Sequence, residues 1–306
     1  RFAYRVLQSM SWRTVVVTGH SKLEYKMGYL ICRGETLKKV HLSEVGTLIV
    51  ESTATSVTAP LLCELIKNKI NVVFCDEKHN PFSQFIPLHG SHDAGKKLKA
   101  QTEWSDGVRV AVWTEIIRDK IYKQAEFLRE IGSDKAELLA GYVSELLPGD
   151  STNREGHAAK VYFGELFGKT FTREDESAFN AALDYGYAII LSAFNRAICA
   201  CGYNTQLGLF HKNEFNPYNL SCDFMEPFRI IVDREVVKMN LHEFGTDEKR
   251  ILQNLLNLPV FLGGKKYVLG DAIATFCRSV FAALNERNTA LMEFYELQIY
   301  ESNSVF

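Results

Sequence analysis

Residues 81–92 read PFSQFIPLHGSH, and the pattern of the sequence changes across this stretch. Pro81, Pro87 and Gly90 interrupt regular structure there, because proline lacks a backbone N–H and glycine has unusual backbone freedom. Before the stretch, short apolar runs alternate with turn residues. After it, apolar residues recur at steps of three and four. The stretch therefore predicts a linker over residues 81–92 between two domains.

Four short apolar runs precede this linker. They are residues 14–17 (TVVV), 29–32 (YLIC), 47–50 (TLIV) and 72–75 (VVFC). Their length and β-branched content are typical of strands. Between the last two runs, the leucines of residues 59–69 recur at helical spacing. We therefore expect a small β domain with one helix over residues 10–80, and we interpret residues 1–9, before Met10, as an extension.

The sequence after the linker has the periodicity of helices. Apolar residues of 93–131 recur at steps of three and four with charges between them. Further helices are predicted near residues 134–147, 153–167, 176–201, 222–239, 247–256 and 269–286. Residues 93–306 are therefore expected to form a larger all-α domain, which makes the chain an α+β protein. Phe294, Tyr295 and Tyr300 are interpreted as part of a tail.

Composition excludes some classes of protein. No apolar stretch approaches the roughly 20 residues of a membrane span, and the start lacks the features of a signal peptide. The seven cysteines contain no CxxC pair, which argues against a zinc site or a disulfide framework. We expect a cytoplasmic protein that does not bind membranes.

The net charge of −2 is not typical of a nucleic-acid-binding protein. It does not exclude DNA, because binding depends on where charges lie rather than on their sum. Two basic clusters are Lys96, Lys97 and Lys99, and then Arg118, Lys120 and Lys123. Taken alone, each cluster is better interpreted as a solvated helix face.

Three places carry chemically active side chains. In residues 151–159 (STNREGHAA), Thr152 and Glu155 have the spacing of a capping box, so Glu155 could be a helix cap without a catalytic role. Taken locally, the capping role is the better interpretation, although the neighbouring Arg154 and His157 also suit a functional site. His211 stands where an apolar stretch gives way to an Asn-rich loop, a place where a histidine is ordinarily a surface or capping residue.

The third place is residues 221–229, SCDFMEPFR. Asp223 and Glu226 are three apart and share one face of a helix. Pro227 is tolerated only in the first turn of that helix, where its missing N–H has no consequence. The two acids could therefore be N-terminal caps, but Arg229 adds a base and makes the combination unusual.

Glu155, His211 and Glu226 together form a carboxylate–imidazole–carboxylate set. Such a set leaves coordination positions open for water and a phosphate oxygen. Its oxygen-rich composition suits Mg²⁺ or Mn²⁺ better than zinc. The three residues are far apart in the sequence, so only the fold could bring them together.

Several segments resemble the family of CRISPR-associated integrases. They are residues 153–159 (NREGHAA), 180–188 (NAALDYGYA), 205–211 (TQLGLFH) and 223–229 (DFMEPFR). Residues 11–17 (SWRTVVV) and 41–45 (HLSEV) resemble the type II branch of that family. The similarity extends from about Met10 to about Asn285 with the motifs in the same order.

The resemblance implies that Glu155, His211 and Glu226 are the catalytic residues and hold Mg²⁺ or Mn²⁺. It implies a supporting carboxylate at Asp223. The residues expected to contact DNA are Arg154, Arg229, Lys96, Lys97 and Lys99. The implied reaction is attack by the 3′-hydroxyl of a spacer DNA on a phosphodiester at the leader–repeat junction of a CRISPR array.

The same resemblance implies partners. The β domain would form a homodimer, and two dimers would flank a dimer of the second, smaller adaptation protein in a heterohexamer. Double-stranded spacer precursor and repeat DNA, the type II effector nuclease and other adaptation factors are further expected partners in the bacterial cytoplasm. Two alternatives remain: a metal-dependent nuclease of branched or single-stranded DNA without integration, and a non-catalytic helical DNA-binding scaffold.

Overall fold

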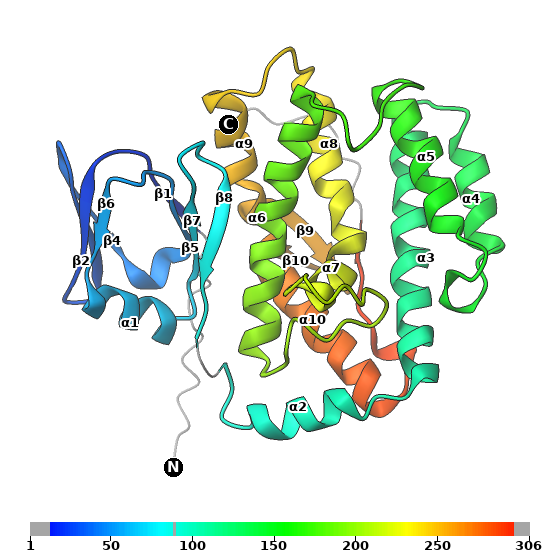
Figure 1. The fold of residues 1–306 in the computed structure, drawn as a ribbon, viewed down its shortest axis with the longest axis horizontal. Coiled ribbons are helices and arrows are strands. Elements are labelled where there is room, and N and C mark those ends of the chain that lie inside the picture. The colour runs from blue at the N-terminus through cyan, green and yellow to red at the C-terminus, as the bar shows by residue number, and fades with distance from the viewer. Residues whose placement is uncertain (1–12, 88–89, 297–306) are drawn as a thin grey trace. The chain divides into compact units, whose positions relative to one another are not determined.

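The computed structural model describes residues 13–87 and 90–296 and divides into two compact units, residues 1–88 and 89–306 (Figure 1). The interpreted extension, residues 1–9, and Tyr300 lie outside the described residues. The smaller unit carries most of the strands and the larger unit most of the helices. A mixed α+β fold is therefore confirmed.

In its described residues, the smaller unit contains two four-stranded sheets, one α-helix and the short 3-10 helix Leu42–Glu44. The first sheet has the order β1 (Arg13–Val17), β5 (Val45–Val50), β7 (Asn71–Cys75), β8 (Pro81–Phe85), and only β8 runs antiparallel to its neighbour. The second has the order β4 (Leu37–His41), β3 (Tyr29–Arg33), β2 (Ser21–Lys26), β6 (Thr55–Val57). Helix α1 spans Ala59–Lys67. Leu23, Leu48 and Leu61, from both sheets and the helix, meet in one apolar core.

The first five residues of the predicted linker are a strand. Residues 81–85 form β8, which pairs with β7 at the edge of the sheet. Pro81 is accommodated because it is the first residue of an edge strand, where a missing N–H interrupts no ladder. The linker prediction is therefore wrong for residues 81–85, and the chain passes to the second unit after Leu88.

The larger unit is mainly helical. Its helices are α2 (Ala94–Thr102), α3 (Asp106–Glu130), α4 (Ala136–Ser144), α5 (Arg154–Phe167), α6 (Ala178–Ala200), α7 (Asn219–Met225), α8 (Arg229–Met239), α9 (Thr246–Gln253) and α10 (Leu269–Glu286). Helix α6 packs against α7, α8, α9 and α10. At Gly186 of α6, an added Cβ would lie 2.4 Å from Val232 Cγ1 of α8, so the glycine permits this close helix crossing. In the described parts of the chain, none of the helices combines the length and apolar character needed to cross a membrane.

The prediction of an all-α second domain is wrong in one respect. Strands β9 (Pro259–Leu262), β10 (Lys265–Val268) and β11 (Tyr295–Glu296) form an antiparallel sheet in the order β10-β9-β11. Gly263 and Gly264, both with positive φ, make the turn between β9 and β10. Two glycines between short apolar runs are a hairpin signal, which a search for helical spacing overlooks. Tyr295, interpreted as part of a tail, is a buried member of this sheet.

Candidate metal centre

The start of α5 leaves the side chain of Glu155 available for a functional contact. Asn153, in the left-handed conformation, is the N-cap and accepts a backbone N–H of the first turn. Asp150 accepts the backbone N–H groups of Arg154 at 2.7 Å and Glu155 at 3.0 Å. The predicted capping box of Thr152 and Glu155 is therefore wrong, because Asp150 and Asn153 already satisfy the exposed N–H groups of this turn.

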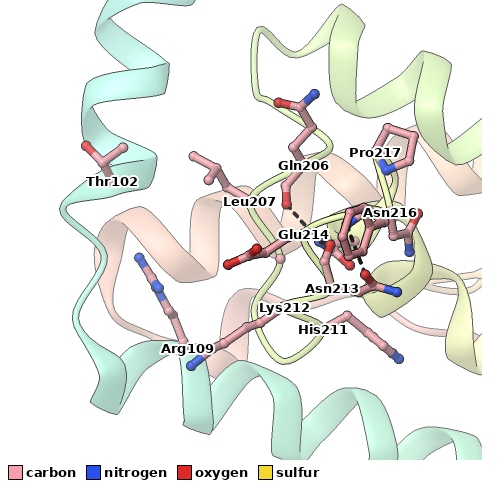
Figure 2. A pocket seen from close by; sticks show the side chains of 13 residues that line it. Thr102, Arg109, Gln206, Leu207, His211, Lys212, Asn213, Glu214, Asn216 and Pro217 are labelled. Atoms are coloured by element: carbon pink, nitrogen blue, oxygen red, sulfur yellow. Dashed lines mark hydrogen bonds between the residues drawn. The ribbon is translucent and has the colours of Figure 1, made fainter.

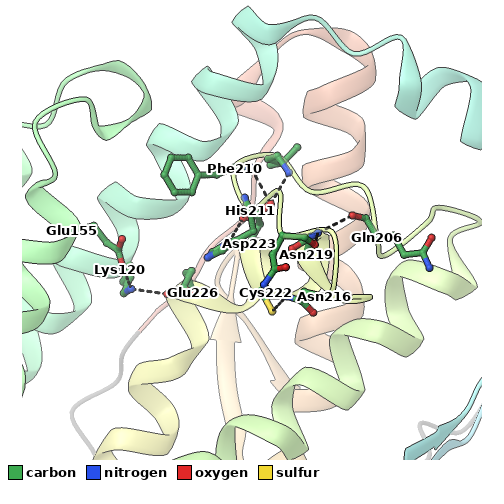
Figure 3. A network of polar contacts seen from close by, with 12 residues as sticks. Lys120, Glu155, Gln206, Phe210, His211, Asn216, Asn219, Cys222, Asp223 and Glu226 are labelled. Carbon is green, nitrogen blue, oxygen red and sulfur yellow. Dashed lines mark hydrogen bonds and ion pairs between the residues drawn. The ribbon is translucent and has the colours of Figure 1, made fainter. Parts of the chain in front are cut away.

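Glu155 and Glu226 meet at the ammonium of Lys120. Lys120 Nζ, on α3, lies 2.5 Å from Glu155 Oε1 and 2.5 Å from Glu226 Oε2 (Figure 3). The Lys120 and Glu226 side chains are 8% and 6% exposed, so this is a desolvated cluster and not a surface pair. The interpretation of Lys120 as part of a solvated helix face is wrong. Sequence reasoning missed its position because the two carboxylates come from other elements.

Glu226 lies at a break between two helices. It ends α7 and begins a short 3-10 turn, Glu226–Phe228, which leads into α8. Pro227 is in the first turn of this 3-10 helix, as the sequence required, and not in the interior of α7. The proline also produces the break, since it cannot donate to the preceding turn. Asp223 and Glu226 are not N-terminal caps, as one interpretation of the sequence had them.

The opposite charges of Glu226, Lys120 and Arg229 stabilise one another's ionised forms. Burial raises the pKa of Glu226, but Arg229 and Lys120 outweigh it and bring that pKa to about 2. Burial lowers the pKa of Lys120, but the carboxylates of Glu226 and Glu155 raise it above its ordinary value. Arg229 Nε donates to Glu226 Oε1 at 3.0 Å. The buried carboxylate therefore stays anionic between two cations at neutral pH.

Asp223 holds His211 and the loop around it. Its Oδ2 accepts the backbone N–H groups of Leu209 at 2.5 Å and Phe210 at 3.1 Å. Its Oδ1 accepts the backbone N–H of His211 at 3.2 Å and lies 2.5 Å from the ring Nδ1 (Figure 3). This hydrogen bond raises the pKa of His211 despite partial burial. Because Nδ1 is engaged, Nε2 is the ring nitrogen left for a metal or a substrate.

His211 also lines a pocket of about 820 Å³ (Figure 2). Arg109 and Lys212 bring two positive charges to its wall, and Phe215, which is 93% exposed, adds an aromatic ring. Beside His211, Phe210 stacks on Trp113 with ring centroids 4.6 Å apart. Sequence analysis missed Arg109, Lys212 and these aromatic residues, because only the fold brings α3 to the loop before α7.

The other predicted DNA-contacting residues lie apart from the acidic pair or make local ion pairs. Arg154 Nη2 lies 2.8 Å from Glu145 Oε2, and its guanidinium faces the ring of Tyr142. On α2, Lys97 pairs with Asp93 at 3.1 Å, and Lys99 lies 3.9 Å from Glu103. Lys96 is exposed on the same helix. Among the described residues, Arg229 is therefore the predicted DNA-contacting cation that forms an ion pair with a predicted ligand.

The residues present suit a divalent cation in their chemistry. Across residues 13–87 and 90–296, the side chains do not form a ready group of three potential metal ligands. Glu155 and Glu226 nevertheless converge on one positive nitrogen, and the charge of Glu226 contributes to the raised pKa of His211 in the same unit. Carboxylate oxygens with one imidazole are donors that Mg²⁺ or Mn²⁺ accepts. These donors therefore suit a divalent cation, and the ammonium of Lys120 takes the place of its positive charge between the two carboxylates.

A further buried carboxylate, Asp233, interacts electrostatically with Arg229 and Lys120 of this cluster. It accepts hydrogen bonds from the hydroxyls of Tyr162 at 3.1 Å and Tyr187 at 2.5 Å. Burial raises its pKa to about 6, although the hydrogen bonds from Tyr187 and Tyr162 lower it. The residue is 1% exposed, so its ionisation is coupled to folding.

Asp233 is expected to make stability depend on pH. Because the folded pKa lies above the unfolded one, the stabilisation is present at low pH and is lost as pH rises through about 6. Between pH 4.5 and 7, the wild type should lose about 2 kcal/mol of unfolding free energy relative to Asp233→Asn. Urea unfolding of both proteins across this range measures the difference. Parallel curves for the two proteins would contradict the assignment.

Comparison with known proteins identifies the family. Residues 15–248 match the family model described as CRISPR associated protein Cas1. A CRISPR-associated endonuclease Cas1 of Neisseria meningitidis serogroup C (strain 8013) is 38% identical over 239 residues, which cover 77% of this chain and 78% of the relative.

Solved structures agree in fold. A casposase bound to integration product has a TM-score of 0.72 at 18% identity and covers 90% of this chain and 91% of that one. A CAS1 protein from Thermotoga maritima has a TM-score of 0.72 at 17% identity, covering 89% and 97%. A Cas6-RT-Cas1–Cas2 complex has a TM-score of 0.69 at 16% identity, covering 96% of this chain and 36% of that one. By the match to the family model and to the Neisseria relative, the chain belongs to the CRISPR-associated Cas1 family.

Proposed function

We propose that this Cas1 is a metal-dependent DNA endonuclease and integrase that inserts spacer DNA into a CRISPR array. In the proposed reaction, the 3′-hydroxyl of the spacer attacks a phosphodiester at the leader–repeat junction. The convergence of Glu155 and Glu226 on one buried positive charge, in a chain of this family, carries the proposal. A carboxylate pair of this kind can bind the cation that offsets the negative charge developing on a phosphate during the reaction.

Glu155, Glu226 and His211 Nε2 would hold Mg²⁺ or Mn²⁺. When bound, the metal would supply positive charge for the phosphate oxygens and lower the pKa of a bound hydroxyl. Asp223 fixes the orientation of the His211 ring through Nδ1. Arg229 keeps Glu226 ionised and leaves its guanidinium at the edge of the cluster. These residues are therefore set in place before any substrate arrives.

The pocket beside His211 suits the end of a DNA strand. Arg109 and Lys212 can neutralise phosphates, and an exposed ring such as that of Phe215 can stack on a base. Lys96, Lys97, Lys99 and Arg154 are proposed to follow the backbone of the double-stranded spacer precursor and repeat DNA. The local ion pairs of Lys97, Lys99 and Arg154 are weak enough, at partly exposed sites, to exchange for phosphates.

We further propose the assembly that the family resemblance implies. Residues 10–80 would mediate a homodimer, and two dimers would flank a dimer of the smaller adaptation protein, as the Cas1–Cas2 composition of one structural relative suggests. The type II effector nuclease and other adaptation factors are proposed as further partners. The place of action would be the bacterial cytoplasm, where the array DNA lies.

A nuclease that performs hydrolysis alone is the second candidate, because the Neisseria relative is named an endonuclease. It would use the same residues with water in place of the 3′-hydroxyl as nucleophile. A labelled DNA fragment incubated with a supercoiled repeat plasmid distinguishes the two. An integrase joins label to plasmid, whereas a nuclease only cuts.

Half-site integration with the small partner protein and Mn²⁺ tests the proposal. We expect His211→Ala to reduce joined product by about 100-fold, since loss of a metal ligand removes charge stabilisation at the phosphate. His242→Ala, which replaces an exposed histidine in the loop after α8, is the matched control and should retain full activity. Product that persists in His211→Ala would remove that ligand from the site. No product from the wild type would favour the nuclease or scaffold alternatives.

A further inference from the structure

Lys120 fills the place between the two acidic side chains from inside the protein. A lysine is seldom buried unless its charge is paired, and Lys120 is 6% exposed with an acidic oxygen at 2.5 Å on each of two sides. We propose that Lys120 is an internal counter-cation, which holds Glu155 and Glu226 together in the metal-free protein and competes with the divalent ion for them. This inference rests on the proposed metal site.

The distances make the competition direct. A divalent ion such as Mg²⁺ or Mn²⁺ binds carboxylate oxygens at roughly 2.1 Å. Lys120 Nζ is already 2.5 Å from Glu155 Oε1 and from Glu226 Oε2, so a metal on these two oxygens would overlap the ammonium. Metal binding at this pair is therefore an exchange of cations. The flexible four-carbon side chain of lysine allows the ammonium to withdraw without a change in α3.

The rest of the cluster does not depend on Lys120 for its charge. Arg229 holds the other oxygen of Glu226 at 3.0 Å, so that carboxylate keeps a cationic partner when the ammonium leaves. Removing the Lys120 charge should then have two opposite effects. It leaves two carboxylates facing each other in the metal-free protein, which destabilises the fold, and it removes the competing cation, which strengthens metal binding.

Lys123 provides a matched control on the same helix. It is also buried, but it pairs with Asp119 and lies over the ring of Tyr295 with Nζ 3.9 Å from the centroid. Its replacement should also lower the unfolding temperature. It should leave the affinity for metal unchanged, because Asp119 is not one of the proposed ligands.

The test is Mn²⁺ binding to the full chain, followed by the electron paramagnetic resonance signal of free Mn²⁺ and by thermal unfolding with added Mn²⁺. Lys120→Met should unfold at a lower temperature without metal and bind Mn²⁺ at least about tenfold more tightly than the wild type. Lys120→Arg, which keeps the charge, should bind like the wild type. Lys123→Met should be less stable and bind Mn²⁺ within about twofold of the wild type.

Each outcome bears on one proposal. Equal or weaker Mn²⁺ binding by Lys120→Met, with normal binding by the wild type, overturns the role of Lys120 and leaves the metal site intact. Equal binding by Glu226→Gln and the wild type overturns the metal site, and with it the proposed function. If Lys120→Met folds only with Mn²⁺ present, its rate of Mn²⁺ release into EDTA is compared with that of Lys120→Arg. Slower release supports the proposal, and equal or faster release contradicts it.

Discussion

Replacing Glu226 by Gln is expected to lower strand joining by at least about 100-fold, which is the largest effect on activity that we predict. The replacement exchanges one carboxylate oxygen for an amide NH₂ group. The carboxylate is buried, its pKa is held at about 2, and it is shared by Lys120 and Arg229. A neutral amide brings no negative charge, so it binds a divalent cation much more weakly than the carboxylate does, and it leaves Arg229 partly unpaired. Half-site integration with Mn²⁺ and the small partner measures the loss.

Stability must be measured alongside activity. Removing one charge of a buried ion pair costs about 3 kcal/mol, so the variant should also unfold at a lower temperature. Glu235→Gln is the matched control, because Glu235 lies on α8 and pairs with Lys238 away from the cluster. It should change neither quantity appreciably. Full joining activity in a folded Glu226→Gln protein would contradict the assignment of Glu226 as a ligand.

The helices of the larger unit could be predicted well from the sequence. The helices predicted near 153–167, 176–201 and 269–286 agree closely with α5, α6 and α10. In each, apolar residues recur with the period of a helix because one face packs against the core. The hairpin of β9 and β10 was missed because its strands are four residues long and its signal is the glycine turn rather than a period.

Helix ends could not be placed by the same reasoning. Capping depends on which side chain reaches a backbone N–H, and the competing Asp150 precedes the predicted box of Thr152 and Glu155. Pro227 does lie in the first turn of a helix, but the helix predicted near 222–239 is divided into α7, the 3-10 helix Glu226–Phe228 and α8. Local propensity decides such details only when no neighbouring group offers a better hydrogen bond.

The residues of the site also divide into those that the sequence indicated and those that only the fold reveals. Glu155, His211 and Glu226 were grouped by their side-chain chemistry and assigned as ligands through the resemblance, and they remain proposed ligands whose spacing alone could not have united them. The support of His211 by Asp223 was expected on the same basis, and the hydrogen bond at Nδ1 agrees with it. Lys120 could not be recognised, because a lysine in a charged helix ordinarily faces solvent. Its burial follows from contacts with two elements that lie far along the chain.

Asp223→Asn is expected to weaken Mn²⁺ binding by about 10- to 100-fold and to lower stability by about 3 kcal/mol. The wild-type carboxylate accepts two backbone N–H groups on one oxygen, and a third N–H together with the His211 ring on the other. An amide presents an NH₂ group to one of these sets, where donors would face donors. The loop and the ring should both shift, which calorimetric Mn²⁺ titration and urea unfolding would register.

A double-mutant cycle separates the two roles of Asp223. If the carboxylate acts on the metal through His211, then Asp223→Asn in a His211→Ala background should cause little further loss of Mn²⁺ affinity. The loss of stability should remain in both backgrounds, because the backbone N–H groups of Leu209 and Phe210 lose their acceptor regardless of the ring. Asp271→Asn is the control, since Asp271 Oδ2 is buried and has no hydrogen-bond partner among the described residues. Additive losses of affinity in the double variant would mean that Asp223 supports the site independently of His211.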